Sequence, residues 1–243
     1  MFSLYLKEIR SFLSSIIGYV VIIVFLLLNS LFTWVFPGQF NTLEAGYSNL
    51  DTLFIIAPWV FLFLIPAITM RTFAEEQKNG TIELLLTKPL TEFQLVFSKY
   101  LSSLTLVFIA LVPTLIYYIS IYQLGNPVGN IDAGGTLGSY IGLFCLSSVF
   151  ISIGVFASSL THNQIVAFIL TVFLCFFFYT GFEAIGSFLL FGALDSFIIN
   201  LGINAHFISI SRGVVDTRDL LYFVGLTTIF LLLTQAKIKS RKW

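Results

Sequence analysis

Six long apolar runs constrain the fold of this chain more than any other feature of its sequence. A helix needs about 20 predominantly apolar residues to cross the hydrocarbon core of a bilayer, and all six runs reach or approach that length. They lie at residues 15–36, 53–70, 100–122, 137–160, 165–191 and 219–236. Only 10% of the residues are charged, and no polar segment between the runs is long enough to build a soluble domain. We therefore expect an all-α, polytopic membrane protein with six transmembrane helices in a single domain over residues 1–243.

Residues 1–14 are expected to form an interfacial helix ahead of the first run. At about 100° per residue, Phe2 and Ile9 fall on one face, whereas Lys7 and Arg10 fall on the opposite side. A helix with an apolar stripe on one face and cations on the opposite face is suited to lying in the headgroup plane of the membrane. The alternative is that the segment extends the first spanning helix. The following apolar stretch is too long for a signal peptide and lacks a small-residue cleavage site, so we expect it to be retained.

The positions of Lys and Arg predict the orientation in the membrane. Ten of the 12 lie in the N-terminal segment, in residues 71–99 and in the tail 237–243. The loops expected on the other side contain only Arg212 and Arg218. Because cytoplasmic segments carry an excess of these cations, we expect both termini and the 71–99 loop to be cytoplasmic.

The fifth run is longer than one span requires, and Glu183 interrupts it near its end. A carboxylate in the middle of a bilayer is energetically costly, so we place Glu183 at or near the outer interface. Residues 183–218 are then expected to contain short re-entrant or outer-surface helices, over 184–192 and 194–201, before the last span. The alternative is one long tilted helix.

Two Thr-x-x-Gln patterns lie between apolar runs. Thr91 with Gln94, and Thr161 with Gln164, fit the capping box that satisfies free backbone N–H groups at a helix start. They predict the first residues of the third and fifth spanning helices.

No recognisable catalytic or nucleotide-binding motif is present. The sequence has no GxxxxGK[ST] loop to hold phosphates, no His-Glu-x-x-His pattern and no CxxC pair. His162 and His206 are expected on opposite sides of the membrane, and Cys145 and Cys175 are expected to be small buried side chains. The spans contain few of the ionisable groups that ion-driven transporters use. We therefore expect no catalytic residue, no metal and no cofactor, and the net charge of zero gives no reason to expect a nucleic-acid partner.

The segment from Met70 to Pro89 is a charged island between two apolar runs. We expect a first helix to end at Gly80, because glycine tolerates the left-handed backbone that terminates helices. Thr81 can cap a second short helix. Glu83 would lie in its first turn, where an acidic side chain complements the helix dipole. The expected result is a short amphipathic helix on the cytoplasmic surface.

This segment resembles the cytoplasmic loop of type-2 ABC exporter permeases. The matching residues are Glu75, Glu76, Gly80, Thr81, Glu83, Leu84, Leu85, Pro89 and Lys99. In that family the loop after the second span carries a coupling helix that docks into a separate ABC ATPase subunit. The resemblance implies a permease subunit of an ABC exporter that has no nucleotide site of its own. It implies a coupling contact made by Glu75, Glu76, Gly80, Thr81, Glu83, Leu84, Leu85 and Pro89. The residues themselves predict a first helix from Arg71 to Asn79 with Glu75 and Glu76 exposed. No residue is assigned to the cargo.

Two further stretches are similar to the gliding-motility ABC permease GldF of the Bacteroidota. They read M-F-x-L-x-x-K-E-I-R-S-F-L-S-S-x-I-G-Y at the N-terminus and H-F-x-x-x-S-R-G-V-V-D-T-R-D-L-x-Y-F from His206 to Phe223. This likeness implies a location in the bacterial inner membrane and a link to gliding motility or surface export. It also implies a GldG-like second membrane subunit, with a homodimer as the alternative.

Two other classes of function are compatible with the sequence. One is a structural membrane anchor whose cytoplasmic loop binds a partner other than an ATPase, which co-purification would distinguish. The other is a membrane-embedded enzyme. Its only candidate cluster is Arg212, Asp216, Arg218 and Asp219. We interpret that cluster as a salt-bridged cap on the last span.

Overall fold

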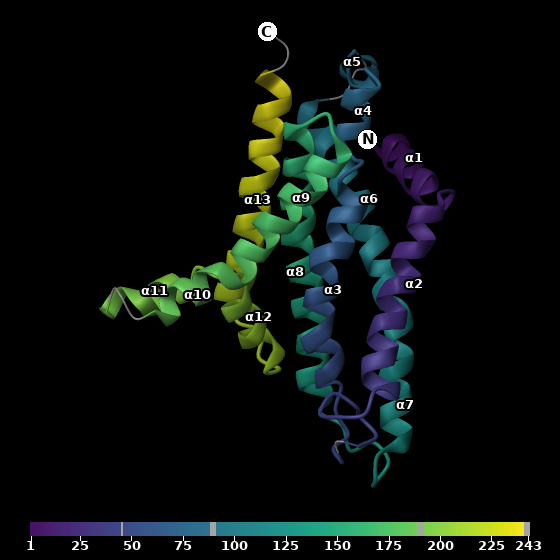
Figure 1. The fold of residues 1–243 in the computed structure, drawn as a ribbon, viewed down its shortest axis with the longest axis vertical. Helices are drawn as coiled ribbons and strands as arrows, with labels where there is room; N and C mark the ends of the chain where they lie inside the picture. The colour runs from purple at the N-terminus through teal and green to yellow at the C-terminus, as the bar shows by residue number, and fades with distance from the viewer. Residues whose placement is uncertain (45, 88–90, 189–191, 241–243) are drawn as a thin grey trace.

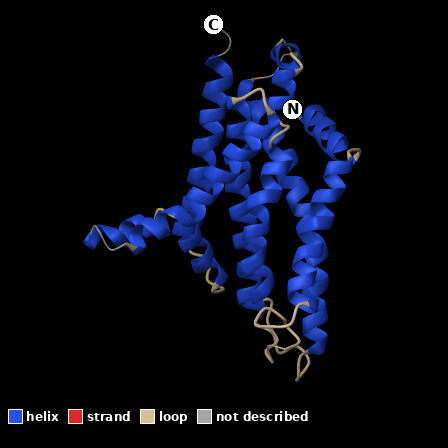
Figure 2. Cartoon of the chain, in the orientation of Figure 1, coloured by secondary structure: helices blue, strands red, loops and turns tan. Residues whose placement is uncertain are grey.

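The computed structural model describes residues 1–44, 46–87, 91–188 and 192–240. These ranges contain helices, turns and loops but no strand (Figures 1 and 2). Six helical spans are long and apolar enough to cross a membrane: Ile16–Val35, Asp51–Lys78, Glu92–Leu124, Ala133–Leu160, Gln164–Ser187 and Thr217–Lys239. The expectation of an all-α polytopic membrane protein with six transmembrane helices is confirmed.

The N-terminal helix α1 (Phe2–Leu13) is separate from α2 (Ile16–Ser30), which continues into a π-helical turn η1 (Leu31–Val35). The Ser15 side chain caps α2 by accepting a hydrogen bond from the Gly18 amide at 3.3 Å. The side of α1 that packs against the bundle carries Leu4, Glu8 and Phe12. The predicted apolar stripe lies elsewhere on α1, and Phe2 is 71% exposed. That stripe is free to contact lipid, and its place at the membrane surface stays a prediction.

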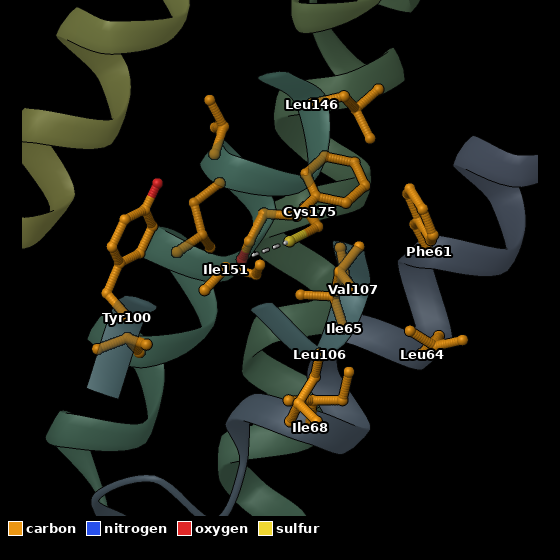
Figure 3. Packing of buried hydrophobic residues seen from close by; sticks show 14 of the residues in the cluster. Phe61, Leu64, Ile65, Ile68, Tyr100, Leu106, Val107, Leu146, Ile151 and Cys175 are labelled. Carbon is orange, nitrogen blue, oxygen red and sulfur yellow. Dashed lines mark hydrogen bonds between the residues drawn. The ribbon is translucent and has the colours of Figure 1, made fainter. Parts of the chain in front are cut away.

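Two central helices, α3 (Asp51–Thr69) and α8 (Ala133–Leu160), belong to the two most deeply buried spans. Figure 3 shows Phe61 and Ile65 of α3 in the same buried cluster as Leu146 and Ile151 of α8. Gly154 of α8 lies so close to the Thr69 side chain that a Cβ there would overlap it. Small residues at such crossings let two membrane helices approach closely. Cys145 and Cys175 are both free thiols.

The third span consists of α6 (Glu92–Leu111), the 3₁₀ turn η2 (Val112–Thr114) and α7 (Leu115–Leu124). The change of helix type coincides with Pro113, which lacks an N–H to donate to the preceding turn. The predicted capping box is confirmed, because the Gln94 amide donates to the Thr91 hydroxyl and the Thr91 amide donates to the Gln94 side chain. This start lies before the apolar run that begins at residue 100, so Lys99 is inside the helix.

The fifth span consists of α9 (Gln164–Phe176), a π-helical turn η3 (Phe177–Gly181) and α10 (Phe182–Ser187). The predicted start of α9 was wrong. The cap is Asn163, whose side chain accepts from the Ile165 amide at 2.9 Å, and the Thr161 hydroxyl accepts from the Asn163 amide instead. Asparagine is among the strongest N-cap residues, and Asn163 stands two positions closer to the apolar run than Thr161.

Three short elements follow: the 3₁₀ turn η4 (Gly192–Leu194), α11 (Asp195–Ile199) and α12 (Ile203–Ser211). The helices α10 and α11 project sideways from the bundle, and α12 runs back along it before the last span, α13 (Thr217–Lys239) (Figure 1). Residues 183–218 therefore include short helices, whereas their position at an outer membrane surface stays a prediction.

Two short helices, α4 (Ala74–Lys78) and α5 (Thr81–Leu86), lie at one end of the molecule. Figure 1 places the N-terminus and the C-terminal end of α13 at the same end. The charged segment and both chain ends therefore share one side of the bundle.

Candidate coupling site

The helices α4 and α5 meet at Gly80, as the sequence predicts. Gly80 has a φ of 68°, in the left-handed region that glycine adopts without strain. The expected Thr81 cap was wrong: Gly80 occupies the cap position, Thr81 is the first residue of α5, and no side chain among the described residues caps this helix. The Thr81 hydroxyl donates to the backbone oxygen of Glu76 instead, at 3.4 Å. The turn thus holds α5 at a fixed angle to α4.

One side of α5 is covered and the other is open. Ile82 and Leu85 are 4% and 8% exposed, and Leu84 is 67% exposed. Glu83 also lies on the open side, in the first turn of the helix. This open side combines an apolar side chain with a carboxylate and can contact a protein partner. Pro89, the last predicted site residue, lies outside the described residues, as does the side chain of Leu86.

The end of α8 holds α4 in place. The Ser158 hydroxyl accepts hydrogen bonds from the amides of Phe73 and Ala74, each at 3.0 Å, and donates to the Met70 carbonyl at 3.1 Å. The Gln77 side chain donates to the backbone oxygen of Ser159 at 3.0 Å. A push on α4 would therefore be transmitted directly to the central helix of the bundle.

A buried ion cluster connects α4 with α1 and α6. The Lys99 ammonium lies 2.9 Å from Glu76 Oε1 and 3.1 Å from Glu8 Oε1, and it donates to the Thr72 carbonyl at 2.6 Å. The Lys99 side chain is only 1% exposed, and its Nζ is 5.1 Å from the centre of the Phe73 ring. Three segments distant in sequence thus meet at one cation.

The charges within this cluster balance. Lys7 lies 3.8 Å from both Glu8 and Glu76, so two cations face two carboxylates. Taking a charge out of water is costly, and the cost is offset only when partners and hydrogen bonds surround it. Lys99 meets this condition with two carboxylates, a carbonyl and an aromatic face. Any movement of α4 relative to α1 or α6 would separate buried opposite charges, so the three helices should move together.

The expectation that Glu75 and Glu76 are both exposed was wrong for Glu76. Its side chain is 13% exposed because it turns inward to Lys99. Glu75 remains 38% exposed and pairs with Arg71 at 3.0 Å, four residues before it. Sequence reasoning missed Glu8 entirely. The available signal was Lys99, because a lysine next to an apolar span requires a partner.

The polar residues near the start of α13 are arranged differently from the predicted salt-bridged cap. Asp216 does cap the helix, accepting from the Arg218 amide at 2.9 Å. Asp219, however, pairs with His206 at 2.6 Å, and neither Arg212 nor Arg218 makes an ion pair within the described residues. The His206 ring also stacks on the Tyr222 ring, and their centres are 3.9 Å apart.

Comparison with known families identifies the chain as a whole. The model of the ABC-2 family transporter proteins matches residues 3–236. The chain belongs to the ABC-2 transporter family. An ABC-2 permease is the transmembrane component of an ABC transporter and not its ATPase, so membership implies an ABC ATPase partner and a membrane location. Together with the six apolar spans, it establishes this ABC-2 permease as a multi-pass membrane protein. A search of curated proteins gave no match.

Proposed function

We propose that this ABC-2 permease is the membrane subunit of an exporter, driven by a separate ATPase that docks on α4 and α5. The observation that carries the proposal is the open side of α5, on which Glu83 and Leu84 are exposed. That side lies beyond the spans, at the same end as both termini (Figure 1). An exposed apolar side chain beside charge is typical of a protein interface.

The internal contacts of the site support transmission of force from that surface. Behind the open side, Ser158 fixes α4 to α8, and the Lys99 cluster fixes it to α1 and α6. Closure of the ATPase would therefore move several spans and not a single loop. We propose that Glu75, Gly80, Thr81, Glu83, Leu84, Leu85 and Pro89 form or shape the contact, and that Glu76 acts from behind it through Lys99.

The finer assignment follows from the resemblance to GldF. We propose a location in the bacterial inner membrane with both termini cytoplasmic, and a role in gliding motility or surface export. A GldG-like subunit or a second copy of the chain would complete the membrane part of the transporter. Outward-facing side chains of α2 and α9, such as Ile23 and Phe173, are 56% and 64% exposed and could contact lipid or such a subunit.

The docking proposal is tested by recovering the ATPase with tagged permease from solubilised membranes. Gly80→Val places a β-branched residue at a φ of 68°, which misdirects α5. Glu83→Lys reverses the charge on its open side. We expect each variant to reach the membrane at normal levels and to recover about tenfold less ATPase.

Matched controls separate docking from folding. Gly80→Asn should retain the ATPase, because asparagine tolerates left-handed backbone. Gln123→Lys adds a cation at an exposed site on the opposite end of the third span and should also have no effect. Full recovery of the ATPase by both Gly80→Val and Glu83→Lys would disprove the docking assignment. Absence of any ATPase from the wild-type preparation would favour the structural anchor.

A further inference from the structure

A cavity of about 250 Å³ lies between the fifth span and α12, away from the coupling site. It is lined by Tyr179, Glu183, Ile199, Gly202, Asn204, Ala205, Ile208 and Arg212. These residues come from η3, α10, α11, α12 and the turn before α12. The cavity is smaller than pockets for drug-sized ligands, which start at about 300 Å³. It therefore suits a small polar group and not a large cargo.

One wall of the cavity is a group of oxygen acceptors. The Glu183 carboxylate accepts a hydrogen bond from the Asn204 side chain at 2.8 Å, which leaves the other Glu183 oxygen and the Asn204 carbonyl oxygen available. The Tyr179 side chain is 5% exposed, and its hydroxyl has no hydrogen-bond partner within the described residues. Its ring is held by edge-to-face contacts with Trp59 at 5.9 Å and Phe150 at 6.0 Å. The aromatic contacts of the core thus fix the position of the Tyr179 ring, while its hydroxyl remains available for a hydrogen bond.

The other charged lining residue is Arg212, which ends α12. Its guanidinium makes no ion pair within the part of the chain that the structure describes. A guanidinium offers paired donors that match the oxygens of a phosphate. The cavity therefore combines one unpaired cation with a set of acceptors around one carboxylate, and a ligand carrying both charges would satisfy both.

The place of the cavity along the chain points to the headgroup level of the membrane. Arg212 lies five residues before Thr217, where the last span begins, and Glu183 lies in the last helix of the fifth span. The lining includes apolar side chains, of which Ile208 is 45% exposed. A phospholipid meets this description, with its headgroup in the cavity and its acyl chains along the exposed apolar side chains.

We propose that this cavity binds the phosphoethanolamine headgroup of a membrane phospholipid. The primary ammonium has three N–H donors, as a lysine ammonium has, and the available acceptors are Glu183, Asn204 and Tyr179. The phosphate binds Arg212. A phosphocholine headgroup has no N–H donor for the acceptors, and a phosphoglycerol headgroup brings no cation to Glu183. The site thus distinguishes headgroups that carry the same phosphate, and it does so independently of ATPase docking.

The test is native mass spectrometry of the full-length permease, both alone and purified with its partner subunits. Phosphoethanolamine, phosphocholine and phosphoglycerol lipids with identical acyl chains are added in separate titrations. We expect the phosphoethanolamine lipid to bind about tenfold more tightly than the phosphocholine lipid, because a hydrogen bond to a charged group discriminates by about that factor. Glu183→Gln should remove most of this preference. Arg212→Gln should weaken both lipids, whereas Arg218→Gln, which alters an arginine outside the cavity, should change neither.

Three results would overturn the proposal. The first is equal binding of the phosphoethanolamine and phosphocholine lipids by the wild-type chain. The second is a preference that Glu183→Gln leaves intact. The third is retention of the lipid by the permease alone but not by the complex, which would show that a protein partner fills the cavity. A further titration with free phosphoethanolamine identifies the source, because binding of the headgroup as tightly as the whole lipid would assign the site to a soluble ligand.

Discussion

Lys99 is held more firmly than any other cation in the described structure. Two carboxylates, a backbone carbonyl and an aromatic face surround its ammonium, and its side chain is 1% exposed. Removing one partner of a buried ion pair is much more damaging than replacing the pair, because it leaves uncompensated charge in a low-dielectric site. The effect on stability of substituting Lys99 therefore depends on whether Glu8 and Glu76 keep their charges.

We predict that Lys99→Met strongly destabilises the protein. The substitution roughly keeps the length of the side chain but leaves two buried carboxylates with only Lys7, 3.8 Å away and 60% exposed, to balance them, at a cost of about 3–5 kcal/mol. Thermal unfolding of the detergent-purified permease should shift downward by on the order of 10 °C.

A variant that also removes both carboxylate charges serves as the control for Lys99→Met. The triple variant Lys99→Met, Glu8→Gln, Glu76→Gln should recover a large part of the loss, because it removes the unpaired charges together. If the single and triple variants melt together, the buried ion cluster is not what stabilises this corner.

Parts of the candidate site could be predicted from single residues, and other parts could not. Gly80 was predictable because a helix end next to a new helix start calls for left-handed backbone. The place of Glu83 in the first turn of α5 followed from the same local pattern. The inward turn of Glu76 was not predictable, because it depends on Glu8 and Lys99, which lie in two other helices. The spacing of residues within one segment carries no information about contacts between side chains of different helices.

At the scale of elements, the crossing of α3 and α8 depends on the absence of a side chain at Gly154. A methyl group there would overlap the Thr69 side chain in the centre of the bundle. We predict that Gly154→Ala destabilises the permease by about 1–3 kcal/mol through overpacking. The shift can be measured by thermal unfolding in detergent.

Gly225 of α13 provides the matched control. A Cβ at that position has no heavy atom within 4 Å. Gly225→Ala should therefore leave stability unchanged or raise it by about 0.5–1 kcal/mol, the ordinary gain of alanine over glycine in a helix. Equal behaviour of the two alanine variants would contradict close packing of α3 against α8.

Hydropathy was sufficient to predict the six spans, because each must cover the same apolar thickness. It was a poorer guide to their ends. The third helix begins at Glu92 because the polar capping box lies well before the apolar residues. The fifth begins at Gln164 because Asn163 competes successfully with Thr161 for the cap. The sideways course of α10 and α11 depends on contacts between elements, for which the sequence carries no simple signal.

For the whole molecule, the shared end of both termini, α4 and α5 makes a clear prediction about sidedness. Single cysteines introduced at Leu43, Asn130 or Thr217 should react with an impermeant thiol reagent in intact cells. Cysteines at Lys78 or Ser240 should react only after permeabilisation. All five positions are exposed and lie at the ends of the candidate spans or outside them, and Leu43 is 62% exposed.

The labelling background should lack both native thiols, as Cys145→Ser and Cys175→Ser, so that each signal comes from one site. The expected pattern follows from the ten cations on one side and two on the other. Reaction of the Lys78 cysteine from outside would reverse the proposed orientation, and the ATPase could then not reach α5.

The cluster around Lys99 also has a consequence for biosynthesis. Glu8 and Glu76 precede Lys99 in the chain, so both carboxylates leave the ribosome before the lysine does. When α6 enters the membrane, its cation can be neutralised at once by segments that are already made. In the reverse order, a nascent helix would wait in the translocon with an unmatched charge. The order of these three residues thus makes both partners of Lys99 available before α6 is inserted.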